Sequence, residues 1–274
     1  MTDIAAAFTR ARAQDRAALI GYLPAGFPTV DLAVAAIETM VGAGVDIVEV
    51  GLPYSDPLMD GPVIQSAVEQ ALRTGTTTAD VIDTVQRVHE ATGVPTLIMS
   101  YWNPIERHGV ERFAAEFAAA GGAGVIAPDL TPEEAGGWLA AARQHRIDPV
   151  FLAAPSSTDA RLRLIAEHSG GFVYAASTMG VTGARAAVGS RAPELVARLR
   201  AVTGLPVGVG LGVSSGAQAA EVAQYADGVI VGSAFVRCLL EADSPAAGVA
   251  AVGRLAAELA AGVRSRALAP AADR

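Results

Sequence analysis

Lysine is absent from this sequence of 274 residues, and all 20 of its basic residues are arginines. A covalent imine with a carbonyl substrate, or with pyridoxal phosphate, requires a lysine amine, which excludes Schiff-base chemistry on this chain. The formal net charge of −8 and the scattered positions of the arginines also argue against a nucleic-acid-binding surface.

Cysteine is almost absent as well. Cys238 is the single one, which excludes an internal disulfide and any metal cluster built from cysteines. We expect it to be a small buried side chain in a late helix. No metal site is expected, because the four histidines show no ligand spacing among them. These histidines are His89, His108, His145 and His168.

Long apolar runs are also missing, because Gly, Pro or a charged residue interrupts them repeatedly. No segment approaches the roughly 20 apolar residues that a membrane-spanning helix requires. Residues 1–16 have no basic start followed by an apolar block, which argues against secretion. Hydrophobic residues make up 51% of the chain and charged residues 18%, a balance that supports a large buried core. We therefore expect a cytoplasmic enzyme.

Short β-branched runs alternate with longer amphipathic stretches, the pattern of a parallel sheet with crossover helices. The predicted strands are 18–22, 46–51, 96–100, 124–127, 149–153, 172–176, 206–210 and 228–231. The predicted helices are 30–41, 78–91, 110–119, 132–145, 159–168, 193–202, 215–224 and 245–260. Doubly wound sheets share this alternation, so the count of eight strands is the feature that favours a (β/α)8 TIM barrel, one domain over residues 1–274.

Three helices are expected in addition to the regular alternation. A helix at 4–12 is placed to cap the bottom of the barrel, another at 63–73 follows the second strand, and a third at 233–240 follows the eighth. Pro132 and the two acids after it resemble the first turn of a helix, and Ser214 or Ser215 is suited to cap the seventh one. Residues after about 262 are expected to form a mobile tail.

Reacting groups in such barrels gather at the C-terminal ends of the strands. Glu49 lies in the second half of an otherwise apolar strand, on the same face as Ile47 and Gly51. Burial there raises the pKa of a carboxyl group, which suits it to give and take protons near neutral pH. The alternative is a structural Glu paired with an arginine of the barrel.

The following loop, residues 52–62, carries two more acids, Asp56 and Asp60. Asp-Pro and Asp-Gly are ordinary turn formers, so a structural explanation of both remains open from the residues alone. The distance along the chain between Glu49 and Asp60 nevertheless allows both carboxylates to face one pocket.

Glycine-rich loops follow the last three predicted strands, at 179–185, 208–215 and 231–235. Backbone amides in such loops, together with the N-terminus of a short helix, are a common phosphate site in these barrels, although glycine also marks plain turns. Residues 177–191 form a long loop that we expect to be a lid, with Gly180, Gly183 and Gly189 as hinges, unless it is a disordered excursion.

Several segments closely resemble the tryptophan synthase α-subunit family. The strongest is EVGLPYSDPLMDGPVIQ at 49–65. The others are LPAG at 23–26, YWNP at 101–104, PDL at 128–130, MGVTG at 179–183 and DGVIVGS at 227–233. They occur in order from about residue 18 to 240. The resemblance implies a (β/α)8 lyase that splits indole-3-glycerol phosphate into indole and glyceraldehyde 3-phosphate. It also implies an αββα complex, with pyridoxal phosphate on the β subunit and no cofactor on this chain.

The resemblance also implies roles for individual residues. Glu49 matches the proton-transferring carboxylate, Asp60 the one that binds the indole N–H, and Tyr174 the tyrosine beside Glu49. The lid and phosphate positions match Thr182, Gly183, Gly212, Gly232 and Ser233. The wall around the indole ring matches Tyr22, Ile64, Met99, Ile126, Leu211 and Ile230. The β-subunit contacts match Pro53, Ser55, Asp56, Pro57 and Asp129.

Departures from the family pattern are few. Tyr22 and Leu211 stand where many members have Phe, and Thr131 replaces a frequent Pro. Three alternatives are a free-standing lyase that releases indole, a non-catalytic phosphate-binding regulatory subunit, and another sugar-phosphate barrel enzyme. The last is an isomerase, which the motifs disfavour, or a class I aldolase, which the missing lysine excludes.

Overall fold

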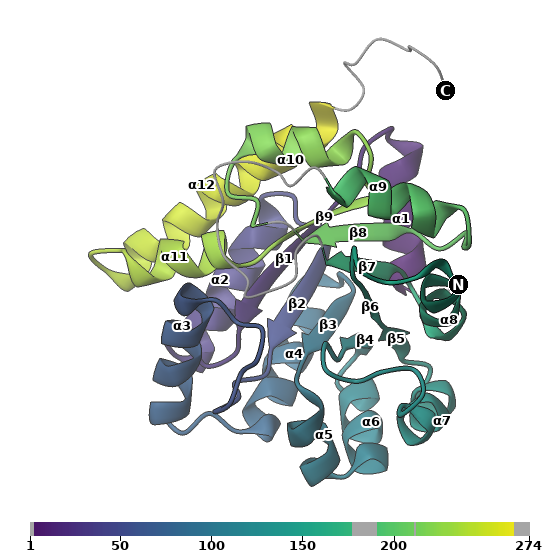
Figure 1. Cartoon of the computed structure of the whole chain (residues 1–274). Coiled ribbons are helices and arrows are strands. Elements are labelled where there is room, and N and C mark those ends of the chain that lie inside the picture. The colour runs from purple at the N-terminus through teal and green to yellow at the C-terminus, as the bar shows by residue number, and fades with distance from the viewer. Residues whose placement is uncertain (1–2, 177–190, 211, 266–274) are drawn as a thin grey trace.

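The computed structural model describes residues 3–176, 191–210 and 212–265 (Figure 1). In these ranges it contains one parallel sheet with the strand order β5-β4-β3-β2-β1-β9-β8-β7-β6. The strands are β1 Ala18–Pro24, β2 Ile47–Gly51, β3 Thr96–Met99, β4 Gly122–Ile126, β5 Asp148–Val150, β6 Leu152–Ala153, β7 Val173–Ala176, β8 Val207–Gly210 and β9 Gly228–Val231.

The two ends of this strand order are neighbours in the chain, which makes the sheet a nearly closed barrel. Only Phe151 separates β5 from β6, and its carbonyl accepts a hydrogen bond of 3.2 Å from the backbone N–H of Tyr174. β5 pairs with β4, whereas β6 pairs with β7. The predicted fifth strand is therefore interrupted at one residue, and the predicted eight-stranded TIM barrel is confirmed.

Helices surround the barrel, as Figure 1 shows. They are α1 Asp3–Ala13, α2 Val30–Gly42, α3 Pro62–Arg73, α4 Thr78–Thr92, α5 Trp102–His108, α6 Val110–Ala119, α7 Gly136–His145, α8 Asp159–His168, α9 Arg191–Arg200, α10 Gly216–Ala223, α11 Ser233–Leu240 and α12 Pro245–Arg264. The expected extra helices at the N-terminus, after the second strand and after the eighth are α1, α3 and α11. Ser215 caps α10, as predicted.

The interior of the barrel is a packed core. Its apolar layer joins side chains from the strands, such as Ile20 and Ile230, to the buried face of α1. The ring centroid of Phe8 on α1 lies 5.5 Å from that of Phe172 at the start of β7. α1 therefore closes the N-terminal end of the barrel, as the sequence predicts, and leaves only the C-terminal mouth for a site.

One predicted helix begins later than expected, and one short helix was not predicted. The first turn expected at Pro132 is an isolated turn, in which the N–H of Glu134 bonds to the carbonyl of Thr131 at 3.1 Å, and α7 begins only at Gly136. The short helix α5 was not predicted. Its first turn holds Pro104, a residue that helix starts tolerate because the amide there has no helical partner.

α12 is longer and more apolar than the sequence argument allowed. It extends through Arg264 instead of ending at residue 260, and residues 266–274 lie outside the described ranges. Its most apolar 18-residue window has a mean hydropathy of 1.4, so this helix is long and apolar enough to cross a membrane on length and composition alone. The sequence argument, which looked for an uninterrupted apolar run, overlooked this window, because alanine, valine and leucine raise its mean hydropathy around Arg254 and Glu258. α12 packs against α2, α10 and α11.

Candidate active site

Glu49 lies on β2 with its side chain in the mouth of the barrel. Its neighbours in register are Tyr22 on β1 and Leu97 on β3, and only 1% of its surface is exposed. Within the described ranges no donor reaches its buried Oε1, and no arginine pairs with it. Burial raises the pKa of the Glu49 carboxyl to about 8. The alternative of a structural Glu paired with an arginine therefore finds no support.

Two phenol rings flank this acid, and each hydroxyl lies over a glycine of the next strand. A Cβ atom on Gly51 would lie 2.3 Å from the hydroxyl of Tyr22, and one on Gly210 would lie 2.3 Å from that of Tyr174. Burial, followed by the charge of nearby acids that include Glu49, raises the pKa of both phenols. Both remain neutral near pH 7 and can act as hydrogen-bond donors.

Asp60 ends the loop that connects β2 to α3, and it is 6% exposed. The hydroxyl of Tyr101 donates to its Oδ1 at 3.1 Å, and the side-chain amide of Gln65 donates to its backbone carbonyl at 2.7 Å. Burial raises the pKa of Asp60, whereas the hydrogen bond from Tyr101 lowers it. This burial and these hydrogen bonds favour a functional role for Asp60 over that of an ordinary turn former.

Tyr101 is a candidate site residue to which the sequence argument gave no role. Its hydroxyl accepts a hydrogen bond of 2.8 Å from the backbone N–H of Met59 while it donates to Asp60. One hydroxyl therefore ties the loop 52–62 to the end of β3 and orients the Asp60 carboxylate. The signals available were its place directly after the predicted strand 96–100 and the YWNP motif at 101–104, neither of which identifies a partner.

Tyr101→Phe should reduce kcat/KM for the cleavage reaction by roughly tenfold and the free energy of unfolding by about 1 kcal/mol. The substitution leaves the Met59 N–H without its acceptor and Asp60 without its donor. Steady-state assays and urea unfolding measure the two effects. Tyr54→Phe is the matched control, since its ring packs against Tyr101 at 5.3 Å and no hydrogen bond of its hydroxyl occurs in the described structure. Equal effects of the two substitutions would contradict the role of the Tyr101 hydroxyl.

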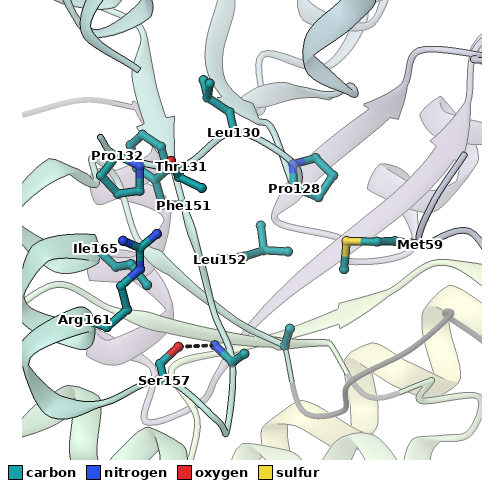
Figure 2. Close-up of a pocket in the computed structure, with 12 residues that line it drawn as sticks. Met59, Pro128, Leu130, Thr131, Pro132, Phe151, Leu152, Ser157, Arg161 and Ile165 are labelled. Atoms are coloured by element: carbon teal, nitrogen blue, oxygen red, sulfur yellow. Dashed lines mark hydrogen bonds between the residues drawn. The ribbon is translucent and has the colours of Figure 1, made fainter. Parts of the chain in front are cut away.

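A largely apolar pocket of about 370 Å³ lies at the ends of the strands β4 and β6 (Figure 2), and neither Glu49 nor Asp60 lines it. Met59, next to Asp60, lines one side of it, and Figure 2 shows Leu152 in its centre with Phe151, Ile165 and Arg161 on the other side. Leu152 is the register partner of Tyr174, which connects the pocket to the interior of the barrel. Its volume lies within the range typical of small-molecule sites, and its lining suits a flat apolar ring.

The opposite side of the mouth is formed by the start of α11. Gly232 precedes this helix without a side-chain cap, and Ser233 is its first residue, 6% exposed. The first amides of a helix have no partner within the helix and attract anions. Gly212, in the loop after β8, adopts a φ of 72°, a conformation that favours glycine. These features suit a phosphate group.

Comparisons with known proteins agree with this arrangement. Residues 8–264 match the family described as "Tryptophan synthase alpha chain". The chain belongs to this family. The tryptophan synthase alpha chain of Acidothermus cellulolyticus is 58% identical, over 96% of this chain and 98% of that one. The one from Streptomyces avermitilis is 61% identical, over 93% and 92%. A structure of Mycobacterium tuberculosis tryptophan synthase matches with a TM-score of 0.90 at 56% identity, over 95% and 98%.

The described wall residues that the family resemblance assigns to the indole ring are buried or partly buried. Ile126 and Ile230 lie in the interior layer of the barrel, Met99 packs against that layer, and Ile64 is buried on α3. Leu211, Thr182 and Gly183 lie outside the described residues, as does most of the predicted lid at 177–191. Their assignment stays a prediction.

The residues predicted to contact a β subunit differ in accessibility. Ser55 and Asp56 are exposed, Pro57 is partly exposed and Pro53 is buried. Asp129 is exposed, and both of its carboxylate oxygens accept from the backbone N–H of Trp102, at 2.9 and 3.1 Å, which ties the loop after β4 to α5. Leu58, in the same loop as Ser55, is 75% exposed. The interface itself stays a prediction.

Cys238 lies on α11 and is partly buried, and burial raises the pKa of its thiol. The expected position in a late helix is confirmed. Among residues 3–176, 191–210 and 212–265, no group of three His, Cys, Asp or Glu side chains is arranged to hold a metal ion.

Proposed function

We propose that Glu49 and Asp60 are the residues with which this chain cleaves indole-3-glycerol phosphate into indole and glyceraldehyde 3-phosphate. The observation that carries the proposal is a buried Glu49 whose Oε1 has no partner among the described residues and whose pKa is raised to about 8. A second acid, Asp60, is held by Tyr101, and the charges of both acids raise the pKa of Tyr22. An enzyme of the tryptophan synthase alpha chain family needs a group such as Glu49, because its reaction moves one proton from oxygen to carbon.

The cleavage is a retro-aldol step that Glu49 can serve twice. In its acid form it protonates the ring carbon that bears the glycerol chain, which gives an indolenine. The resulting carboxylate then accepts the proton of the hydroxyl next to the breaking bond. The oxygen electrons form the aldehyde, the electrons of the carbon–carbon bond return to the ring, and Glu49 is protonated again. A group with a pKa near the working pH performs both transfers well.

Asp60 supports the same step from the nitrogen side of the ring. Protonation of the ring carbon places positive charge on the ring nitrogen, and a nearby carboxylate stabilises that charge. Tyr101 holds one carboxylate oxygen of Asp60, at 3.1 Å, which leaves the other for the indole N–H.

The phosphate group binds at the start of α11 in this proposal. Backbone amides near Gly232 and Ser233, and the loop that contains Gly212, replace the lysine that the chain lacks. Binding at this distance from the breaking bond orients the substrate without a direct part in the chemistry. Tyr174, next to Glu49, is proposed to position the reacting groups as a neutral donor.

We further propose that the chain works in the cytoplasm as the α subunit of an α2β2 complex. The β subunit carries pyridoxal phosphate and receives the indole for synthesis of L-tryptophan. The exposed residues Ser55, Asp56 and Asp129 border the mouth of the site, which supports this face as the interface. Release of indole from indole-3-glycerol phosphate, measured with and without the β subunit, tests the proposal. A free-standing lyase is the correct alternative if the chain alone reaches the full rate.

The pH dependence of kcat/KM gives a sharper test. Only the protonated form of Glu49 can start the reaction, so kcat/KM should fall as the pH rises through about 8. Steady-state assays between pH 6 and 9.5, with the β subunit present, measure this profile. A rate that rises through this range would contradict Glu49 as the initial acid, and a flat profile would contradict it as well.

A further inference from the structure

The hydroxyl of Tyr22 occupies a defined point above Glu49. Tyr22 and Glu49 are register partners on β1 and β2, and Gly51 follows Glu49 by two residues on the same face of the strand. A Cβ atom on Gly51 would lie 2.3 Å from the Tyr22 hydroxyl, so this phenol fills the space of a missing side chain. The hydroxyl therefore lies between Glu49 and the mouth of the barrel.

The Tyr22 side chain is largely buried, and its hydroxyl has no hydrogen-bond partner among the residues that the structure describes. Tyr22 is 6% exposed, and none of its described contacts is a hydrogen bond. Burial raises the pKa of the phenol well above its usual value, and the charges of Asp60 and Glu49 raise it further. A donor at the end of a largely buried side chain is therefore available to a bound ligand that supplies an acceptor.

The part of the Tyr22 side chain next to the backbone faces the proposed phosphate end of the site. A Cβ atom on Gly232 would lie 3.3 Å from Cδ1 of Tyr22, and Gly232 immediately precedes α11. A substrate with its phosphate at α11 and its ring beside Glu49 and Asp60 must lay the connecting chain along Tyr22. In indole-3-glycerol phosphate that connecting chain has three carbons and two hydroxyl groups.

We propose that the Tyr22 hydroxyl hydrogen-bonds the glycerol hydroxyls of the substrate, which makes Tyr22 a specificity-determining residue. The inference rests on the proposed function, because it uses the two ends of that substrate. It differs from the sequence-based assignment of Tyr22 to the apolar wall around the indole ring. A wall needs only the ring of the side chain, whereas this role needs the oxygen.

The test compares two ligands in a chain that does not turn over. In full-length protein bound to the β subunit, the Glu49→Gln variant is compared with the Glu49→Gln, Tyr22→Phe double variant. Calorimetry measures Kd for indole-3-glycerol phosphate and for 3-(indol-3-yl)propyl phosphate, which keeps the ring and phosphate without the hydroxyls. We expect the double variant to weaken binding of the first ligand by roughly three- to tenfold. Binding of the second should change by less than about twofold.

Tyr225→Phe is the matched control, because this phenol lies just after α10 and its buried hydroxyl has no partner in the described structure. It should change neither Kd. Equal weakening of both ligands by Tyr22→Phe would overturn the proposal in favour of an apolar wall, and no change in either would overturn it too. Turnover by Glu49→Gln alone would contradict the proton-transfer role of Glu49, and the KM of indole-3-glycerol phosphate would then replace its Kd in the comparison of the two variants.

Discussion

Replacing Glu49 with glutamine should reduce kcat for cleavage of indole-3-glycerol phosphate on the order of 10² to 10⁴, the range for loss of a general acid–base. Glutamine keeps the size of the side chain but can neither give the ring carbon a proton nor accept one from the hydroxyl. Glu49 is 1% exposed, and no described side chain is hydrogen-bonded to its Oε1. We therefore expect no other group to take over its proton transfers. Indole release under saturating substrate measures the loss.

The matched control is Glu38→Gln, which changes the same charge at an exposed position on α2. It should retain the rate of the unmodified chain. Near-full activity of Glu49→Gln would remove Glu49 from the mechanism. Such a result would also favour the non-catalytic regulatory subunit as the correct alternative.

Stability gives an independent check that Glu49→Gln folds. The unfolded chain loses the Glu49 proton near pH 4.5, whereas the folded chain retains it until about pH 8. The stability linked to this proton is therefore fully present below the first pH and is lost as the pH rises to the second. Glutamine has no proton to lose, so its advantage in free energy of unfolding should grow with pH and reach about 3 kcal/mol at pH 7. Urea unfolding at pH 5 and pH 7 measures the difference.

The sequence predicts the barrel because its information is periodic. Each strand of β-branched residues must be buried on both faces, and each helix must cover it, so the alternation is legible in residues such as Ile47 and Val50. The errors lie where local signals do not determine the outcome. Pro132 with two acids fits one turn as well as a helix start, and the break at Phe151 depends on which neighbour each half of the strand pairs with.

The candidate site shows the same division between local and long-range information. Glu49 is conspicuous because an acid in an apolar strand is rare. Asp60 remains ambiguous in the sequence, because only Tyr101, 41 residues away, distinguishes a held carboxylate from a turn former. The hydroxyls of Tyr22 and Tyr174 are meaningful only beside Gly51 and Gly210, which lie on other strands. Contacts of this kind depend on register across the sheet, which one sequence does not specify.

Replacing Asp60 with asparagine should lower kcat by about 10²-fold with the fold intact, a loss typical of removing one stabilising group from a transition state. Asparagine can still accept a hydrogen bond from the indole N–H, but it lacks the negative charge that opposes the positive charge on the ring. In the unmodified chain the hydroxyl of Tyr101 donates to the Asp60 carboxylate at 3.1 Å, and the side-chain amide of asparagine would alter this hydrogen bond. Steady-state cleavage assays with the β subunit present measure the loss.

Asp83→Asn on α4 is the control for the change in charge, because its exposed carboxylate forms an ion pair with Arg87, at 3.8 Å, on the surface. We expect its kinetics to match those of the unmodified chain. The KM of Asp60→Asn should rise less than its kcat falls, because the charge that Asp60 opposes develops only after the ring is protonated. Unchanged kinetics, or a loss confined to KM, would show that Asp60 binds the ring without stabilising the transition state.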